Sequence, residues 1–216
     1  MTSFEAGSFL ARLTEKDLAA LERAGTIVRY EPGREIFAEG ADSDHVVALT
    51  AGRVKITSVD AGGRESLLAL RAPGDLLGEL SAIDKLPRSA NAYALELAEA
   101  IVVDSIAFTE YLRDHPTAAF ALLEILTSRL RESDRRRIEF GSQSCLARVA
   151  GRLLELHERF GESTLRLSQE ELAAWVGATR EATAKALAML RSMGVINTAR
   201  RRVEVLDPAR LATLAQ

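Results

Sequence analysis

A segment near residue 80 combines residue types that bind an anion. It reads GDLLGELSAIDKLPRSANAY over positions 74–93. A short helix beginning after Gly78 would present free backbone N–H groups, Arg88 can donate a forked pair of hydrogen bonds to phosphate oxygens, and Ser89 adds a hydroxyl and an amide. Glu79 adds a carboxylate, which suits a ligand that also has a sugar hydroxyl to donate, as a nucleotide does. In the alternative interpretation, Arg88 pairs with an internal carboxylate and no nucleotide binds.

A second pattern, around Gly177, is typical of DNA binding. Ser168 and Glu171 form a capping box for a short helix with Leu172, Ala173 and Val176 on its inner face. Gly177 supplies a tight turn, and Thr179 begins a second helix. We expect this helix to bury one face, made of Ala182, Ala186, Leu187 and Leu190. The residues expected on its exposed side, near its start, are Arg180, Glu181, Thr183 and Lys185. This is a helix-turn-helix, whose outer residues reach the major groove.

The stretch from Asn197 to Leu206 reads as a β-hairpin with three arginines at its tip, which completes a winged helix-turn-helix. Positions 177–205 hold six Lys and Arg against two Asp and Glu, a local net charge of +4. The candidate DNA contacts are Ser168, Gln169, Thr179, Arg180, Glu181, Thr183, Lys185, Arg200, Arg201 and Arg202. The alternative is a small helical interaction domain whose charges only face solvent.

Nothing in the sequence predicts catalysis. The histidines at 45, 115 and 157 are isolated, Cys145 has no neighbouring base, and no Gly-x-Ser-x-Gly, Walker or His-Glu-x-x-His pattern occurs. One cysteine also cannot form an internal disulfide or a cysteine-based metal site. We therefore expect neither an enzyme nor a metal protein.

Short alternating strands must position the first candidate site. From residue 26 to 104 the runs IVRY, HVVAL, RVKITSV, SLLAL and AIVVDSI are separated by Gly- and Pro-containing turns, which predicts a β-roll or jelly-roll barrel. A capped short helix that begins after Thr14 would flank this barrel.

A long helix is expected between the two candidate sites. Residues 117–140 contain no Gly or Pro and carry Leu122, Leu126 and Leu130 at four-residue spacing. The polar stretch 131–137 that follows favours pairing with another helix, so we expect a homodimer seam. Residues 140–143 interrupt the helical pattern and are the predicted hinge, after which Ser144 caps a new helix.

Length and charge agree with a two-domain protein that contacts an anionic polymer. The 216 residues are 47% hydrophobic and 27% charged, as in ordinary folded proteins. Residues 1–128 carry a net charge of −8 and residues 129–216 a net charge of +5, although arginines that merely solvate helices would give the same balance. The first residues lack a positive region followed by a long apolar run, so we expect no secretory leader. No apolar run approaches the ~18 residues of a membrane span. The expected location is the cytoplasm.

The run GELSAIDKLPRSANA resembles the phosphate-binding cassette of cyclic-nucleotide-binding domains in the cyclic AMP receptor protein and FNR family of transcription regulators, and GATREATAKAL resembles their recognition helix. The resemblance covers roughly residues 10–206. It implies that Arg88 and Ser89 hold the cyclic phosphate, that Glu79 takes the ribose 2′-hydroxyl, and that Gly78 and Ala90 give backbone contacts.

The resemblance also makes 117–140 a dimerisation helix, on which Ser133 reaches the base and Arg129 approaches the phosphate or ribose. Asp134 replaces a small neutral polar residue and would accept from adenine N6 or from the guanine edge. Lys185 replaces an arginine common in the best-known members.

The sequence thus predicts an α+β chain with a cyclic-nucleotide-binding β-roll at 1–116, a dimerisation helix at 117–140 and a winged helix-turn-helix at 141–216. The predicted function is a homodimeric transcription regulator that binds a near-palindromic DNA site under control of a cyclic nucleotide. Cyclic AMP is the expected effector, cyclic GMP the second choice, and RNA polymerase the expected further partner. The alternatives are a regulator of the same fold that needs no nucleotide, and a nucleotide sensor that acts through protein partners.

Overall fold

The computed structural model describes the chain except residues 1–3, 6, 60–61, 64, 162–163, 166–167 and 200–201. Its internal contacts divide the chain into two compact units, Met1–Arg131 and Glu132–Gln216. The boundary falls within one continuous helix, α5, which runs from Pro116 to Ser142. A proline is well placed at a helix start, because the first N–H groups have no partner inside the helix.

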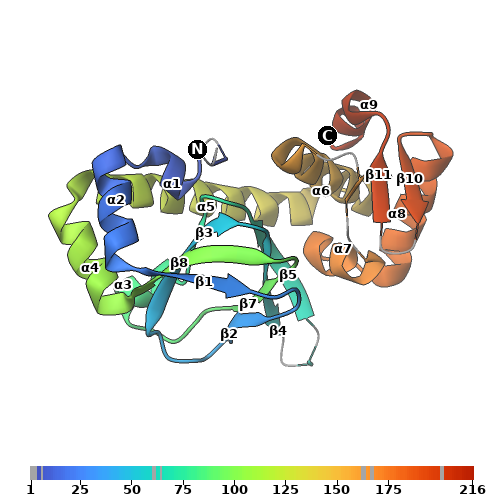
Figure 1. Cartoon of the computed structure of the whole chain (residues 1–216). Helices are drawn as coiled ribbons and strands as arrows, with labels where there is room; N and C mark the ends of the chain where they lie inside the picture. The colour runs from blue at the N-terminus through green and yellow to red at the C-terminus, as the bar shows by residue number, and fades with distance from the viewer. Residues whose placement is uncertain are drawn as a thin grey trace. The chain divides into compact units, whose positions relative to one another are not determined.

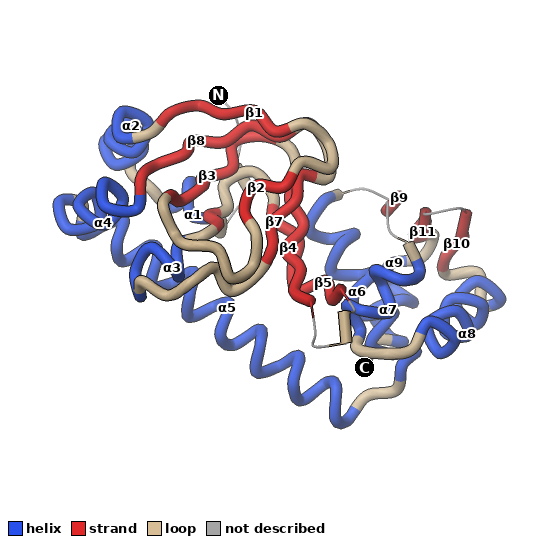
Figure 2. Tube along the Cα trace, turned by 90° about the horizontal axis from the view of Figure 1, so that it is seen from below, coloured by secondary structure: helices blue, strands red, loops and turns tan. Residues whose placement is uncertain are grey.

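The N-terminal unit is a roll of two antiparallel four-stranded sheets, with strand orders β1-β8-β3-β6 and β2-β7-β4-β5. Figure 2 shows β1, β8 and β3 in one layer and β2, β7 and β4 in the other. The strands are β1 (Thr26–Tyr30), β2 (Glu35–Phe37), β3 (His45–Ala51), β4 (Val54–Val59), β5 (Glu65–Arg71), β6 (Leu76–Leu77), β7 (Asn91–Ala94) and β8 (Ala98–Asp104). The expected β-roll is confirmed, with β2, β6 and β7 added as short strands that the alternation did not indicate.

Strand β3 shows how the roll is held together. Its neighbouring residues are buried on both faces: Val47 and Leu49 pack between the two sheets, whereas Val46 and Ala48 pack beneath the helices. Side chains alternate along a strand, so one apolar strand can contribute to two cores. The covering helices are α1 (Phe9–Arg12), α2 (Glu15–Ala24), α3 (Glu79–Asp84), α4 (Ser105–Asp114) and the first part of α5. Figure 1 shows α2 and α4 together at one end of the strands.

Helix α5 has two apolar faces, which corrects the expected seam. Leu122 is buried and Leu126 packs beside it in the core of the N-terminal unit, while Leu130 is exposed. The three leucines at four-residue spacing therefore do not share one environment, since two lie in the core and the third faces solvent. Within the N-terminal unit, the exposed large apolar residues of α5 are Phe120, Leu123 and Leu130, at spacings of three and seven. Ile138 and Phe140 are also exposed, further along the helix.

Over its described residues, the C-terminal unit contains the end of α5, four further helices and a three-stranded sheet of order β10-β11-β9. The elements are α6 (Cys145–Phe160), β9 (Thr164–Leu165), α7 (Gln169–Val176), α8 (Arg180–Ser192), β10 (Ile196–Ala199), β11 (Arg202–Val205) and α9 (Pro208–Leu214). Helix α9 was not expected from the sequence. Its start was nonetheless signalled by Asp207, whose side chain accepts from Arg210 N, and by the proline that follows.

Candidate functional site

The turn before α3 brings Gly78 against the guanidinium of Arg88. Gly78 has a φ of +78° and caps α3. A Cβ at this position would lie 2.2 Å from Arg88 Nη1. Only glycine satisfies both the left-handed backbone and the close approach of the arginine. Gly78 and Arg88, expected at one site from the sequence, do lie together.

Arg88 is buried, with 2% of its surface exposed. Its Nη1 donates to Gly78 O at 3.0 Å and its Nη2 to His45 O at 2.5 Å. The guanidinium lies 4.4 Å from the centre of the Phe37 ring, and its Nε has no hydrogen-bond partner among the described residues. Burial lowers the pKa of Arg88, against the opposing influence of Asp44 and Glu79. Burial of a charge is costly unless an opposite charge or sufficient hydrogen bonds compensate it.

The two nearby carboxylates compensate Arg88 only in part. Asp44 Oδ1 is 3.8 Å from Arg88 Nη2, and the Asp44 side chain is 80% exposed. Glu79 is buried, but its Oε1 lies 2.6 Å from Nη1 of Arg129 on α5, and Arg129 Nη2 also donates to Leu76 O at 3.1 Å. Arg129 thus reaches the cassette through an ion pair with Glu79, and its expected approach to the phosphate or ribose stays a prediction.

The remaining cassette residues are placed by backbone pairing. Arg88 N donates to Ala41 O at 2.9 Å, and Gly40 N donates to Arg88 O at 2.8 Å. Ser89 is exposed, so its hydroxyl is accessible, whereas Ala90 is buried. Sequence reasoning missed Phe37 and the His45 carbonyl, because no local pattern indicates which strands will lie beneath the cassette.

Ser133 and Asp134 are exposed side chains of α5 in the C-terminal unit. Ser133 follows Arg129 by one helical turn and therefore lies on the same side of the helix. Their expected contacts with a nucleotide base remain predictions.

The start of α7 has the expected capping box. Ser168 Oγ accepts from Glu171 N at 3.1 Å, and Ser168 N donates to Glu171 Oε2 at 2.8 Å. Gln169 is exposed as the first residue of the helix. Gly177 ends α7 with a φ of +62°, so the predicted tight turn is confirmed.

Most, but not all, of the predicted DNA-contact residues at the start of helix α8 are exposed. Thr179 caps it by accepting from Ala182 N at 3.2 Å, and Thr179, Arg180, Glu181 and Lys185 are exposed. The hydrogen bonds that Glu181 receives from its own backbone N–H and from Thr179 lower its pKa, so it stays an acceptor. Thr183 was expected on this exposed side, and this is wrong: it is 0% exposed. It belongs to the buried face of Ala186, Leu187 and Leu190, because a small threonine fits that face at helical spacing.

Residues far apart in sequence line one hollow of about 300 Å³ in the C-terminal unit. It is bounded by the start of α7, by α8 and by the β10-β11 hairpin. Its lining includes Ser168, Gln169, Arg180, Thr198 and Arg202. Four of these are predicted DNA contacts, so the fold brings together donors that the sequence places up to 34 positions apart. Arg200 and Arg201 lie outside the described residues. Arg202 begins β11 and is exposed.

Two family descriptions match the chain, Cyclic nucleotide-binding domain over residues 27–115 and Crp-like helix-turn-helix domain over residues 147–214. The chain is 35% identical over 206 residues to the CRP-like cAMP-activated global transcriptional regulator of Mycobacterium tuberculosis, covering 92% of each. It is 32% identical to the Cyclic AMP receptor protein of Thermus thermophilus, covering 86% of each.

Among solved structures, the c-di-GMP responsive global regulator CLP of Xanthomonas campestris superposes with a TM-score of 0.79 at 20% identity, covering 89% of this chain and 99% of that one. This similarity supports the fold alone. Over the described residues, no helix is long and apolar enough to cross a membrane, and no group of three or more His, Cys, Asp or Glu side chains is arranged to hold a metal ion.

Proposed function

The chain belongs to the cyclic AMP receptor protein and FNR family of transcription regulators, which are not enzymes, and on that premise we propose that it is a homodimer whose binding to DNA is controlled by a cyclic nucleotide. Cyclic AMP is the proposed effector, since both curated relatives named above carry it in their names. The proposed location is the cytoplasm, where DNA and RNA polymerase, the proposed further partner, are found.

The proposal that a nucleotide binds rests on one observation, the burial of Arg88 and the hydrogen-bond partners of its guanidinium. Among the described residues, the buried guanidinium has two neutral carbonyl acceptors and an unpartnered Nε. It would gain from an anion, because a phosphate brings the opposite charge that the carbonyls lack. The cyclic phosphate would replace one or both carbonyls, and the exposed Ser89 hydroxyl would donate to it. Glu79, held by Arg129, would accept from the ribose 2′-hydroxyl.

Nucleotide binding would act on DNA through α5. In the proposal, Ser133 and Asp134 contact the base, and the nucleotide therefore favours one arrangement of the dimer helices over another. The exposed residues Phe120, Leu123 and Leu130 supply the apolar seam for a second copy. Two copies related by a twofold axis would read a near-palindromic site, each inserting α8 into the major groove.

One observation favours a second candidate, a regulator that needs no nucleotide. Both Nη atoms of Arg88 already have acceptors, and Glu79 already has Arg129. A site closed in this way would be structural.

Calorimetric titration with cyclic AMP and with cyclic GMP separates the two candidates. We expect saturable binding of cyclic AMP at one site per chain. DNA affinity is then measured with and without the bound nucleotide, on a duplex that the protein selects from a random pool, and should rise about fivefold or more when nucleotide is present. Selection of a palindromic duplex without binding of either nucleotide would establish the second candidate. Nucleotide binding without DNA binding would indicate a sensor that acts through protein partners.

A further inference from the structure

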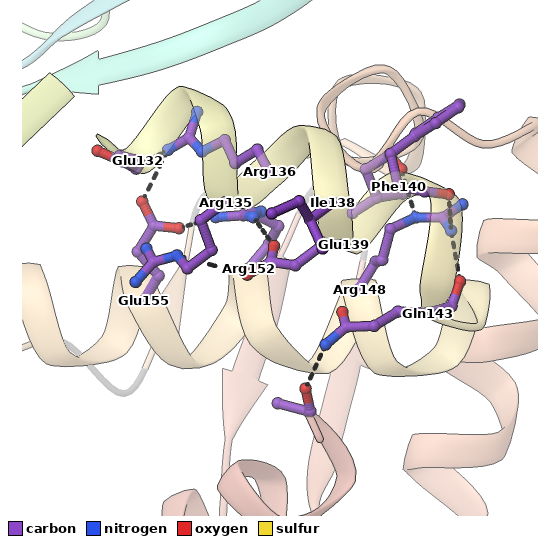
Figure 3. Close-up of polar contacts among 12 residues, drawn as sticks. Glu132, Arg135, Arg136, Ile138, Glu139, Phe140, Gln143, Arg148, Arg152 and Glu155 are labelled. Atoms are coloured by element: carbon purple, nitrogen blue, oxygen red, sulfur yellow. Dashed lines mark hydrogen bonds and ion pairs between the residues drawn. The ribbon is translucent and has the colours of Figure 1, made fainter. Parts of the chain in front are cut away.

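The last turns of α5 are joined to α6 by two arginines on opposite helices. Arg136 on α5 lies 3.1 Å from Glu155 on α6, and Arg152 on α6 lies 2.6 Å from Glu139 on α5. Each arginine also pairs within its own helix, Arg136 with Glu132 and Arg152 with Glu155. Figure 3 shows the resulting chain of alternating charges between the two helices.

Arg152 is the most sheltered member of this chain, with 9% of its side chain exposed. Exposed ion pairs contribute little, but removing one partner of a sheltered pair leaves charges without compensation. Arg135 offers a contrast. It lies 3.4 Å from the same Glu139, within α5, and its side chain is 64% exposed. Arg152 therefore connects the helices, whereas Arg135 does not.

Arg148, also on α6, binds the ends of two other segments. Its Nε donates to Val176 O, the last residue of α7, at 2.9 Å, and its Nη1 donates to Gln143 O, just after α5, at 2.7 Å. Carbonyls at a helix end lack partners within the helix, and a cation there is favourable. The guanidinium also lies 5.1 Å from the centre of the Phe140 ring.

The Phe140 ring reaches the turn of the helix-turn-helix. A Cβ on Gly177 would lie 2.3 Å from Phe140 Cε2, so the ring packs directly on the turn between α7 and α8. Arg136 approaches the same helix pair, 5.9 Å from the centre of the Trp175 ring on α7. The end of α5 thus contacts α6, α7 and the turn that orients α8.

We propose that residues 132–142 of α5 are a fixed part of the DNA-binding unit, and that Arg148 and Arg152 are the positioning residues that fasten them there. The proposal rests on the proposed function, because the fastened block carries the recognition helix α8. A displacement of the earlier part of α5 would then move residues 132–142 and the rest of the DNA-binding unit together. In this proposal α5 bends before Glu132 rather than at residues 140–143, the hinge predicted from the sequence.

Hydrogen–deuterium exchange of the full chain, without any ligand, tests whether Arg152 holds residues 132–142 against α6. In Arg152→Met, the amides of residues 132–142 should exchange about fivefold faster or more, while those of 117–130 and of α8 stay unchanged. Arg135→Met is the matched control, since it removes a partner of the same Glu139 without breaking a link between helices, and should leave exchange unchanged. Arg152→Lys should give an intermediate rate, because one ammonium cannot hold both Glu139 and Glu155 in the same geometry.

DNA binding tests the consequence. On a duplex selected from a random pool by the wild-type protein, Arg152→Met and Arg148→Met should each lower affinity about fivefold or more. Cyclic AMP affinity, measured without DNA, should stay within about twofold, because neither arginine belongs to the cassette. Combining Arg152→Met with Glu139→Gln should cost no more than Arg152→Met alone, because both changes remove the same link.

If the amides of residues 132–142 exchange at the wild-type rate in both Arg152→Met and Arg148→Met, these arginines do not fasten the end of α5, and the proposal is overturned. Faster exchange with unchanged DNA affinity would overturn the positioning role. If Arg152→Met also loses protection throughout α6, the comparison is decided on Arg152→Lys. A wild-type protein that selects no duplex would refute the proposed function, and the exchange measurements would still decide the fastening.

Discussion

Arg88 can be tested by a single substitution. Arg88→Ala removes the donors proposed to meet the phosphate, each worth about 1.5–3 kcal/mol, and we expect cyclic AMP binding to become undetectable by calorimetry. The matched control is Arg29→Ala, because the Arg29 side chain is 75% exposed and pairs with Glu99 away from the cassette. Circular dichroism of both variants checks the fold. Unaltered nucleotide affinity in a folded Arg88→Ala protein would remove the cassette from the proposal.

Asp17 gives the N-terminal unit a pH-dependent contribution to stability. Its buried carboxylate accepts from Thr117 Oγ1 at 2.6 Å and is hydrogen-bonded to His115 Nδ1 at 2.7 Å. Thr117, with Thr14 and His115, lowers the pKa of Asp17 from 3.8 to about 2. The carboxylate therefore stabilises the fold above pH 3.8, and this contribution is lost as the pH falls toward 2.

Asp17→Asn should accordingly lower the free energy of unfolding by ~2 kcal/mol at neutral pH, measured by urea denaturation. The difference from wild type should shrink as the pH drops below 4. Thr117→Val, which removes the first of the three hydrogen bonds, should show part of the loss. A deficit of the same size at every pH would mean that Asp17 acts through packing rather than charge.

The turn between α7 and α8 depends on a contact with another element. Gly177 and Gly161 both have positive φ, +62° and +61°, but a Cβ on Gly161 would meet nothing within 4 Å. Gly161→Ala should therefore cost only the left-handed strain, ~1–2 kcal/mol, and Gly177→Ala should cost more, because Phe140 must also move. In a Phe140→Ala background the two costs, measured by thermal unfolding, should become equal. A persistent difference would place the constraint elsewhere than Phe140.

Helix α8 and the hairpin should read DNA in different ways. Arg180→Ala should cost ~1–3 kcal/mol and relax preference at one position of each half-site, because arginine pairs with guanine O6 and N7. Arg202→Ala should weaken all sequences alike and reduce the slope of log affinity against log salt by roughly 0.9, as expected for one lost phosphate contact. Binding-site selection and salt titration distinguish these results. Arg210, whose Nη1 donates to Met193 O, provides the Arg→Ala control.

At the scale of the whole molecule, the proposed dimer would form through the exposed apolar face of α5. Leu123→Glu should prevent dimer formation in sedimentation experiments, since a charge would enter the apolar seam of Phe120, Leu123 and Leu130. Ile106→Glu on α4 is the control, because Ile106 is also a large exposed apolar residue but lies off this seam. The wild-type dimer should select half-sites about 34–36 Å apart. Sites without inverted symmetry would argue against a twofold dimer.

The sequence by itself determined those elements and turns whose signals are local. The capping box at Ser168, the glycine turn at Gly177 and the strand alternation before residue 104 depend on residues a few positions apart, and the structure confirms them. The same holds for the proximity of Gly78 and Arg88, which lie only ten positions apart. Such signals are local, so a pattern read along the chain captures them.

Only the tertiary structure decided the partners. Arg88 donates to a carbonyl 43 positions away, and Arg129 pairs with a carboxylate 50 positions away. The inward position of Thr183, the two faces of α5 and the attachment of residues 132–142 to α6 likewise follow from which elements pack together. Sequence periodicity states that a face is apolar or charged. It does not state what covers that face, because long-range packing selects among many partners of similar local chemistry.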